Sequence, residues 1–224
     1  MTFSGPLPLT ILEEFLLLAL DDAAGEFYAL PRSTLDCACA GALLMDLTLR
    51  HRIDNDLKDM FTIDTTPTGD DILDPALLVM SLAPVLTPQP IYHWLQLFMA
   101  EGQALREKAL RRLEARGIIR SENKKLLWFF NTRRYPIVHN QETREVKQRI
   151  LGVILNQEIP LPEDIMLTAL AHACGLFGHI LSSQELHRSK ERILLVGRMD
   201  LIGQAVAQAV AEIESAIAMA SGFH

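Results

Sequence analysis

The stretch from Leu35 to Ile53, LDCACAGALLMDLTLRHRI, constrains the fold of this chain most strongly. Between Cys37 and Met45 no side chain carries a charge or a strong hydrogen-bonding group. A helix that is apolar on all sides is buried, and this run is much shorter than the ~20 residues needed to cross a bilayer. We therefore predict a buried central helix over residues 35–50, with a capping-box-like start at Ser33 and Asp36.

The rest of the chain predicts a mostly α, compact helical domain around this central helix, with peripheral β-hairpins. Helix-forming residues dominate, and Gly and Pro fall mostly between the apolar runs. A capping box of Thr10 and Glu13 opens the first helix. We expect helices over residues 10–20, 35–50, 72–83, 101–116, 143–155 and 162–181, a further helix that contains Trp94, and one or two long helices over 183–220. We also expect a short strand over 26–30 and hairpins over 53–64 and 118–137, with turns at 54–56 and 121–124.

The charge is distributed unevenly. Residues 103–149 carry 13 Lys and Arg against 5 Asp and Glu, which leaves 8 Lys and Arg against 23 Asp and Glu in the rest of the chain. A basic segment on an acidic body predicts one face that meets an anionic partner. The alternative is a solvated helix face with scattered ion pairs.

Within the basic helix, Arg106 differs from its neighbours. It lies on the same stripe as Leu110 and Leu113, so its guanidinium is predicted to be partly buried and to need a partner. That partner is either an acidic residue of this chain or a bound anion. The opposite face is predicted to be exposed and to attract anionic lipid. It consists of Lys108, Arg111, Arg112 and Arg116.

The second hairpin carries five large apolar residues in succession, Leu126 to Phe130, on its predicted returning strand. An apolar tip beside basic residues suits insertion into a lipid interface, and the same surface suits self-association, which we favour. The third alternative is a strand buried on both faces. The candidate membrane or oligomer contacts are Leu127, Trp128, Phe129, Phe130, Arg133 and Arg134.

No pattern in the sequence indicates an active site, a metal site or a cofactor site. His172 and His179 lie in an apolar helix close to Cys174, but no carboxylate or second cysteine completes a metal site. Phosphate-binding and dinucleotide-binding loops and nucleophile motifs are absent from the sequence. The three cysteines and the missing signal-peptide pattern favour a cytosolic protein. We expect a non-enzymatic protein without a cofactor.

Several segments in order resemble the Golgi phosphoprotein 3 family. They are LTILEEFLLLALDD, LTLRHRI, PTGDDILDPAL, Trp94, LREKALRRLEARGI and ALAHAC. The resemblance implies one helical domain over residues 8–220 with a membrane-inserting, self-associating hairpin. Eukaryotic members bind phosphatidylinositol 4-phosphate at the Golgi and retain glycosyltransferases by their cytosolic tails. They carry an N-terminal extension that this chain lacks, so the chain resembles a prokaryotic member.

The family's lipid-headgroup residues fall on four positions of this chain. The tryptophan before the central helix corresponds to Pro31, and an arginine inside that helix corresponds to Ala40. An arginine pair on the basic helix corresponds to Gln103 and Arg106. One of the four positions is therefore retained. The candidate headgroup residues are Arg106, Gln103 and Arg32.

These observations predict a cytoplasmic peripheral membrane protein or adaptor. Its partners would be anionic phospholipid, a phosphoinositide by resemblance, and further copies of the chain through the hairpin. The alternatives are a self-assembling scaffold without lipid specificity and a winged-helix-like nucleic-acid binder. The overall acidic charge argues against the last, so we expect no nucleic-acid partner.

Overall fold

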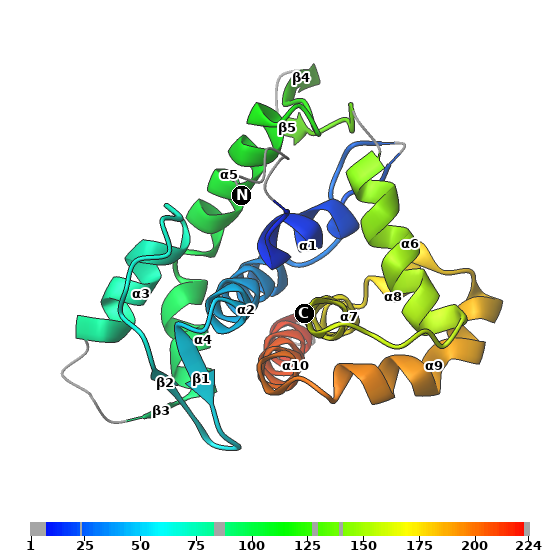
Figure 1. Cartoon of the computed structure of the whole chain (residues 1–224). Helices are drawn as coiled ribbons and strands as arrows, with labels where there is room; N and C mark the ends of the chain where they lie inside the picture. Colours follow the sequence, from blue (N-terminus) through cyan, green and yellow to red (C-terminus); the bar gives the residue numbers. More distant parts are fainter. Residues whose placement is uncertain (1–7, 23, 83–87, 127–129, 139–140, 222–224) are drawn as a thin grey trace, which may run out of the picture.

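Helix α2 (Arg32–Leu49) runs through the middle of the protein, and its residues from Cys37 to Leu47 are all buried. Our computed structural model describes residues 8–22, 24–82, 88–126, 130–138 and 141–221 (Figure 1). Helices α1, α4, α5, α7 and α10 all pack against α2. The predictions of a buried central helix and of a mostly α fold are confirmed. The surrounding helices are α1 (Ile11–Ala19), α3 (Leu73–Leu82), α4 (Ile91–Met99), α5 (Gly102–Ala115), α6 (Gln141–Leu155), α7 (Pro162–Ala173), α8 (Phe177–Ile180), α9 (Ser183–Gly197) and α10 (Leu201–Ser221).

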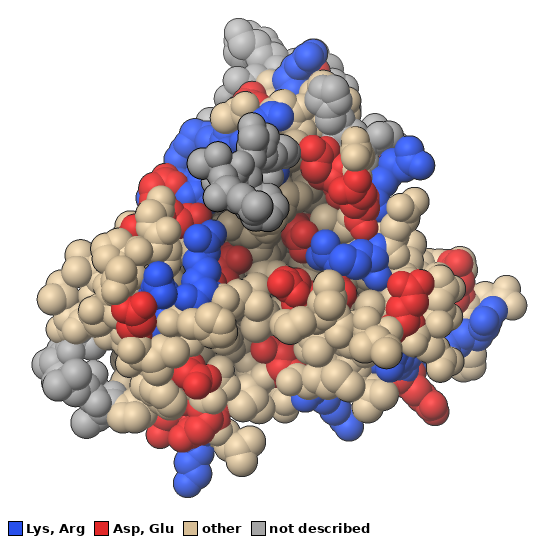
Figure 2. All heavy atoms as spheres, in the orientation of Figure 1, with Lys and Arg blue, Asp and Glu red and all other residues tan. Residues whose placement is uncertain are grey.

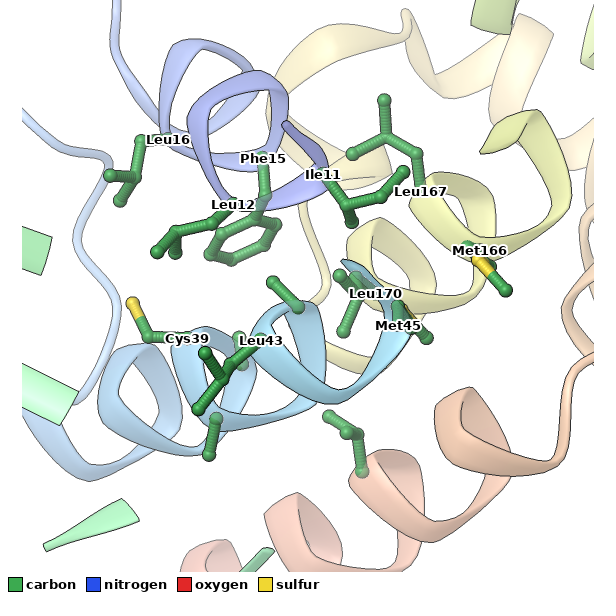
Figure 3. Packing of buried hydrophobic residues seen from close by; sticks show 14 of the residues in the cluster. Ile11, Leu12, Phe15, Leu16, Cys39, Leu43, Met45, Met166, Leu167 and Leu170 are labelled. Atoms are coloured by element: carbon green, nitrogen blue, oxygen red, sulfur yellow. The ribbon is translucent and has the colours of Figure 1, made fainter. Parts of the chain in front are cut away.

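The core forms where α1, α2 and α7 meet. Figure 3 shows Leu12 and Phe15 of α1 above Leu43 of α2, with Leu167 and Leu170 of α7 beside them. These five side chains are fully buried. Small residues in α2 allow close packing, since a Cβ added at Gly41 would lie only 2.5 Å from Cγ2 of Val206 on α10.

The two predicted helix starts have different outcomes. The capping box of Thr10 and Glu13 at the start of α1 is confirmed. The cap predicted at Ser33 is wrong, because α2 begins at Arg32 and its N-cap residue, Pro31, has no side-chain cap. The carboxylate of Asp36 instead accepts a hydrogen bond from Arg106 of α5.

The first hairpin forms as predicted, with its turn about two residues later than expected. Strand β1 (Ile53–Asn55) pairs antiparallel with β2 (Asp59–Thr62), and β2 pairs with β3 (Gln89–Pro90). The strand predicted over residues 26–30 is reduced to a single bridge between Leu20 and Phe27.

The second hairpin is confirmed, but its turn was predicted in the wrong place. Strand β4 (Glu122–Leu126) contains the predicted turn residues and pairs antiparallel with β5 (Phe130–Arg134). The polar residues 122–124 therefore lie in a strand, and Leu126 and Phe130 of the apolar run pair across the two strands. The base of the hairpin is held to the body, because the Tyr135 N–H donates to the Gly25 carbonyl at 2.6 Å.

The C-terminal helices are interrupted where glycine or a short turn allows the chain to bend. The helix predicted over residues 162–181 is split into α7 and α8 around Gly175, which has a φ of 68°. No single helix in the described part of the chain is long and apolar enough to cross a membrane. Helices α9 and α10 satisfy the test only as a pair, and they are bent by 117° relative to one another.

Candidate functional site: the α2–α5 junction and the basic helix

Three of the residues singled out from the sequence gather where the N-terminal ends of α2 and α5 touch. We call this region, Arg32, Asp36, Gln103 and Arg106, the α2–α5 junction. Gly102 makes the contact possible, because a Cβ there would lie 2.5 Å from the Asp36 Cβ and 2.8 Å from its carbonyl oxygen. The absence of a side chain lets α5 begin directly against the backbone of α2.

Asp36 is the centre of the junction. The Nη1 of Arg106 donates to its carboxylate at 2.7 Å, and the two side chains are only 13% and 17% exposed. The Nε of Arg32 lies 3.9 Å from the same carboxylate, but the Arg32 side chain is 66% exposed. The structure therefore shows the internal ion pair that was one of the two alternatives for Arg106. Arg32 remains accessible beside it.

The other three headgroup positions carry no cationic side chain. Gln103 is exposed, and its amide donates to Glu107 at 2.9 Å. Pro31 is exposed at the start of α2, whereas Ala40 is fully buried and presents no polar atom. An anion at the junction would therefore meet two guanidinium groups and the competing carboxylate of Asp36, with Glu107 beside Gln103.

The basic face of α5 is less exposed than its sequence indicates. Arg111 is 64% exposed and lies 3.8 Å from Glu107. Arg112 was predicted to be exposed, but its side chain is only 25% exposed because it forms a bidentate pair with Asp70 at 3.0 and 2.6 Å and also contacts Asp71. Burial opposes the charge of Arg112, yet these carboxylates raise its pKa overall.

The two ends of the basic face are also held by the acidic body. The Nζ of Lys108 donates to the carbonyl of Asp71 at 3.3 Å. The guanidinium of Arg116 lies 3.8 Å from the buried carboxylate of Glu13. Much of the basic segment is thus neutralised within the molecule, and Arg111 is the most exposed of the four predicted residues.

These ion pairs surround a large cleft between α1, the end of α2 and α5. It has a volume of about 1060 Å³, and Figure 2 shows blue and red side chains interleaved around this hollow. Of the lining carboxylates, Glu13, Glu14 and Asp46 are buried, whereas Glu163 is exposed. The charged residues that line it are Glu13, Glu14, Asp46, Arg50, Asp70, Arg112, Arg116, Arg149 and Glu163.

Two charged groups in this cleft, the buried Asp46 and the half-buried Arg149, were not singled out from the sequence. Asp46 accepts hydrogen bonds from the N–H groups of Ile11 and Leu12 at 2.9 and 3.3 Å and so caps α1 from a distant helix. Burial raises the pKa of Asp46 to about 7, although those two N–H groups oppose the shift. An aspartate inside an otherwise apolar run was the signal for such a role.

Arg149 is the second missed residue. It donates to both carboxylate oxygens of Glu14, at 3.1 and 2.5 Å, and also binds Asp164. Burial raises the pKa of Glu14, and Arg149 opposes the shift. The signal in the sequence was the Glu13–Glu14 pair at the start of an apolar helix, because a buried carboxylate requires a partner.

The predicted hairpin contacts lie at the edge of what the structure describes. Leu127, Trp128 and Phe129 lie outside the described residues. Phe130, Arg133 and Arg134 have described backbone positions in β5, but their side chains lie outside the description. Their proposed contacts with lipid or a second copy stay predictions.

The described residues contain no group of three His, Cys, Asp or Glu side chains that could hold a metal ion. Cys37, Cys39 and Cys174 are buried, free thiols. Burial raises the pKa of Cys37 to about 11 and that of Cys39 to about 12. Such thiols remain protonated at neutral pH and are poor nucleophiles.

Comparisons with known proteins place this chain in a family. The family model described as Golgi phosphoprotein 3 (GPP34) matches residues 11–213. The vacuolar protein sorting-associated protein 74 of Eremothecium gossypii is 26% identical over 215 residues, covering 80% of this chain and 63% of that protein. Its namesake from Schizosaccharomyces pombe is 24% identical over 174 residues, covering 68% of this chain and 50% of that protein. This chain thus spans between half and two thirds of these relatives, and it belongs to the Golgi phosphoprotein 3 (GPP34) family.

Proposed function

We propose that this chain is a non-enzymatic, cytoplasmic peripheral membrane adaptor that binds anionic phospholipid through the α2–α5 junction and the exposed part of α5. The observation that carries the proposal is the convergence of Arg32 and Arg106 on Asp36, where Arg106 is the one headgroup position that the resemblance finds retained and Arg32 follows another, Pro31. Family membership and the names of the relatives, which refer to protein sorting, support an adaptor role.

The junction suggests how a phosphate would bind. A phosphate oxygen offers an arginine the same bidentate geometry as a carboxylate, so a headgroup would replace Asp36 as the partner of Arg32 and share Arg106 with it. Because Asp36 stays nearby, it would repel the phosphate. We therefore propose charge-driven binding to anionic membranes, with phosphatidylinositol 4-phosphate as one such lipid.

Sedimentation with vesicles tests this proposal. Neutral, phosphatidylserine-containing and phosphatidylinositol-4-phosphate-containing vesicles are compared at low and high salt. We expect binding to both anionic compositions that weakens with salt, because each basic residue near such a surface contributes about 1 kcal/mol. Asp36→Asn should strengthen the binding and Arg106→Gln should weaken it. Binding to duplex DNA with equal affinity, or to none of the vesicles, would refute the proposal.

We also propose that the β4–β5 hairpin mediates self-association. In the described part of the chain it is a two-stranded sheet, so each strand has one unpaired edge. Sedimentation velocity over a range of concentrations tests this, with Trp128→Ser as the variant. A concentration-dependent oligomer that becomes a monomer in the variant supports the hairpin interface. A monomer at all concentrations excludes it, and an oligomer that binds no vesicle supports the scaffold alternative.

A further inference from the structure

One stretch of this chain is uncharged over an unusual length. From Pro75 to Ala100 there is no Asp, Glu, Lys or Arg in 26 residues, although charged residues make up 22% of the chain. At that frequency the stretch would hold about six. It includes most of α3 and all of α4.

Helix α3 is apolar on the face that it buries and on the face that it exposes. Its inner side chains, Leu77 and Met80 among them, pack into the core. The outer face carries the α3 patch, which we define as Leu78, Val79 and Leu82, with 57%, 44% and 70% of each residue exposed. A helix face made of large apolar side chains is normally buried. The exposed apolar face of α3 therefore indicates a surface that contacts another molecule or a membrane.

The polar side chain nearest to the patch in sequence, Ser81, already has a hydrogen-bond acceptor within the protein. The hydroxyl of Ser81 donates to the carbonyl of Leu77 at 2.7 Å, within the same helix. Transferring the second half of α3 into an apolar medium would therefore leave no side-chain hydrogen-bonding group unsatisfied.

We propose that the α3 patch inserts into the boundary between headgroups and acyl chains of an anionic membrane, as a second contact besides the α2–α5 junction. This inference rests on the proposed function, since it presumes that the chain meets such a membrane. Interfacial helices bury their apolar face about 5–10 Å into this boundary, which needs only a few large side chains.

The size of the patch favours lipid over a second copy of the chain. A stable protein–protein interface takes roughly 20–30 residues on each side. The patch offers three large side chains on a helix of ten residues. That is far too small for a stable dimer.

The surroundings of α3 also suit an anionic surface. Lys108 of α5 donates to the backbone carbonyl of Asp71, just before α3, and Arg112 contacts the Asp71 carboxylate. Two cationic side chains therefore lie beside the start of α3. The exposed Arg111 lies on the same stretch of α5. In Figure 1, α3, α5 and the β4–β5 hairpin follow one another along one edge of the molecule, and Figure 2 shows uncharged surface at the outer edge near α3, with blue and red side chains next to it.

An environment-sensitive label separates this inference from the proposed function. Val79→Cys is coupled to the fluorophore NBD, which leaves the buried native thiols unlabelled. Leu195→Cys, at a residue 54% exposed on α9, is the matched control. With phosphatidylserine-containing vesicles we expect a blue shift and at least a twofold rise in emission at position 79 and no change at position 195. Sedimentation of the same samples reports binding independently.

The three possible outcomes have different meanings. Vesicle binding without a change at position 79 overturns the inference and leaves the proposed function standing. No vesicle binding at all overturns both. A change at position 79 that appears without vesicles and rises with protein concentration assigns the patch to a second copy and also overturns the inference.

Substitution of the patch gives a second test. Leu78→Ser combined with Leu82→Ser should lower the vesicle partition coefficient at least tenfold. The matched control, Ile159→Ser combined with Leu195→Ser, alters side chains that are 93% and 54% exposed elsewhere and should leave it unchanged. Circular dichroism verifies that both variants are folded. Equal binding by both variants would overturn the inference.

Discussion

Replacing Asp46 with Asn should remove a large part of the pH dependence of this protein's stability. The Asp46 side chain lies under the first turn of α1, where its two oxygens accept the N–H groups of Ile11 and Leu12. Asn keeps an oxygen acceptor and the shape of the side chain but cannot ionise. The charged groups that act most on Asp46 are Arg50, which favours its ionised form, and Asp70, which opposes it.

The direction and size follow from the pKa of Asp46. Burial raises it from an ordinary value of 3.8 to about 7 in the folded protein. The folded state therefore binds the proton more tightly than the unfolded state, so this group stabilises the protein fully below about pH 4. The stabilisation decreases as pH rises above about 4 and is fully lost once pH has passed the folded-state pKa of about 7. Between pH 5 and pH 8.5 the loss amounts to about 3 kcal/mol, since one pKa unit corresponds to about 1.4 kcal/mol.

Urea unfolding followed by circular dichroism at several pH values measures this effect. Other titrating groups, Glu14 among them, affect both proteins alike, so the informative quantity is the difference between the wild type and Asp46→Asn. We expect the wild type to be equal or slightly more stable at pH 5 and the variant to be more stable by about 2 kcal/mol at pH 8.5. A difference that stays constant from pH 5 to pH 8.5 would refute the reasoning.

Three further predictions concern the contacts between distant segments. Gly102→Ala should destabilise the protein by about 1–3 kcal/mol in urea unfolding, because its Cβ would overlap the backbone of Asp36; an unchanged midpoint would contradict the close approach. A double-mutant cycle of Arg106→Gln and Asp36→Asn should give a coupling energy of about 1–3 kcal/mol, and a value near zero would show that the ion pair is not formed in solution. Arg149→Met should lower stability by about 2–4 kcal/mol near neutral pH, because it leaves the buried Glu14 carboxylate without its partner. The loss should be smaller at pH 4, where a carboxyl group with a raised pKa is largely protonated. Equal losses at both pH values would count against that account.

The basic segment shows where reasoning from the sequence was incomplete. An excess of Lys and Arg over residues 103–149 predicted a charged face for a partner, and part of that excess serves the protein itself. Arg106, Arg112 and Arg149 bind carboxylates that lie 70, 42 and 135 residues away in sequence. A charge count cannot show this, because the sequence does not tell which charges meet across the fold. Lipid attraction in our proposal therefore depends on the more exposed Arg32 and Arg111.

The sequence by itself determined the local features of this protein. The apolar run of α2 required burial, the Thr10–Glu13 capping box fixed the start of α1, and the basic helix appeared as α5 within one residue of its predicted start. These features depend on neighbouring residues, whose periodicity and capping chemistry are visible in the chain.

Only the tertiary structure decided which groups remain available for a partner. It paired Arg106 with Asp36, withdrew Arg112 from the predicted exposed face and left the apolar outer side of α3 uncovered. It also placed residues 122–124, predicted as a turn, in a strand of the second hairpin. The physical reason is that ion pairing and strand register depend on contacts between segments far apart in sequence, and each helix face is buried or exposed according to what packs against it.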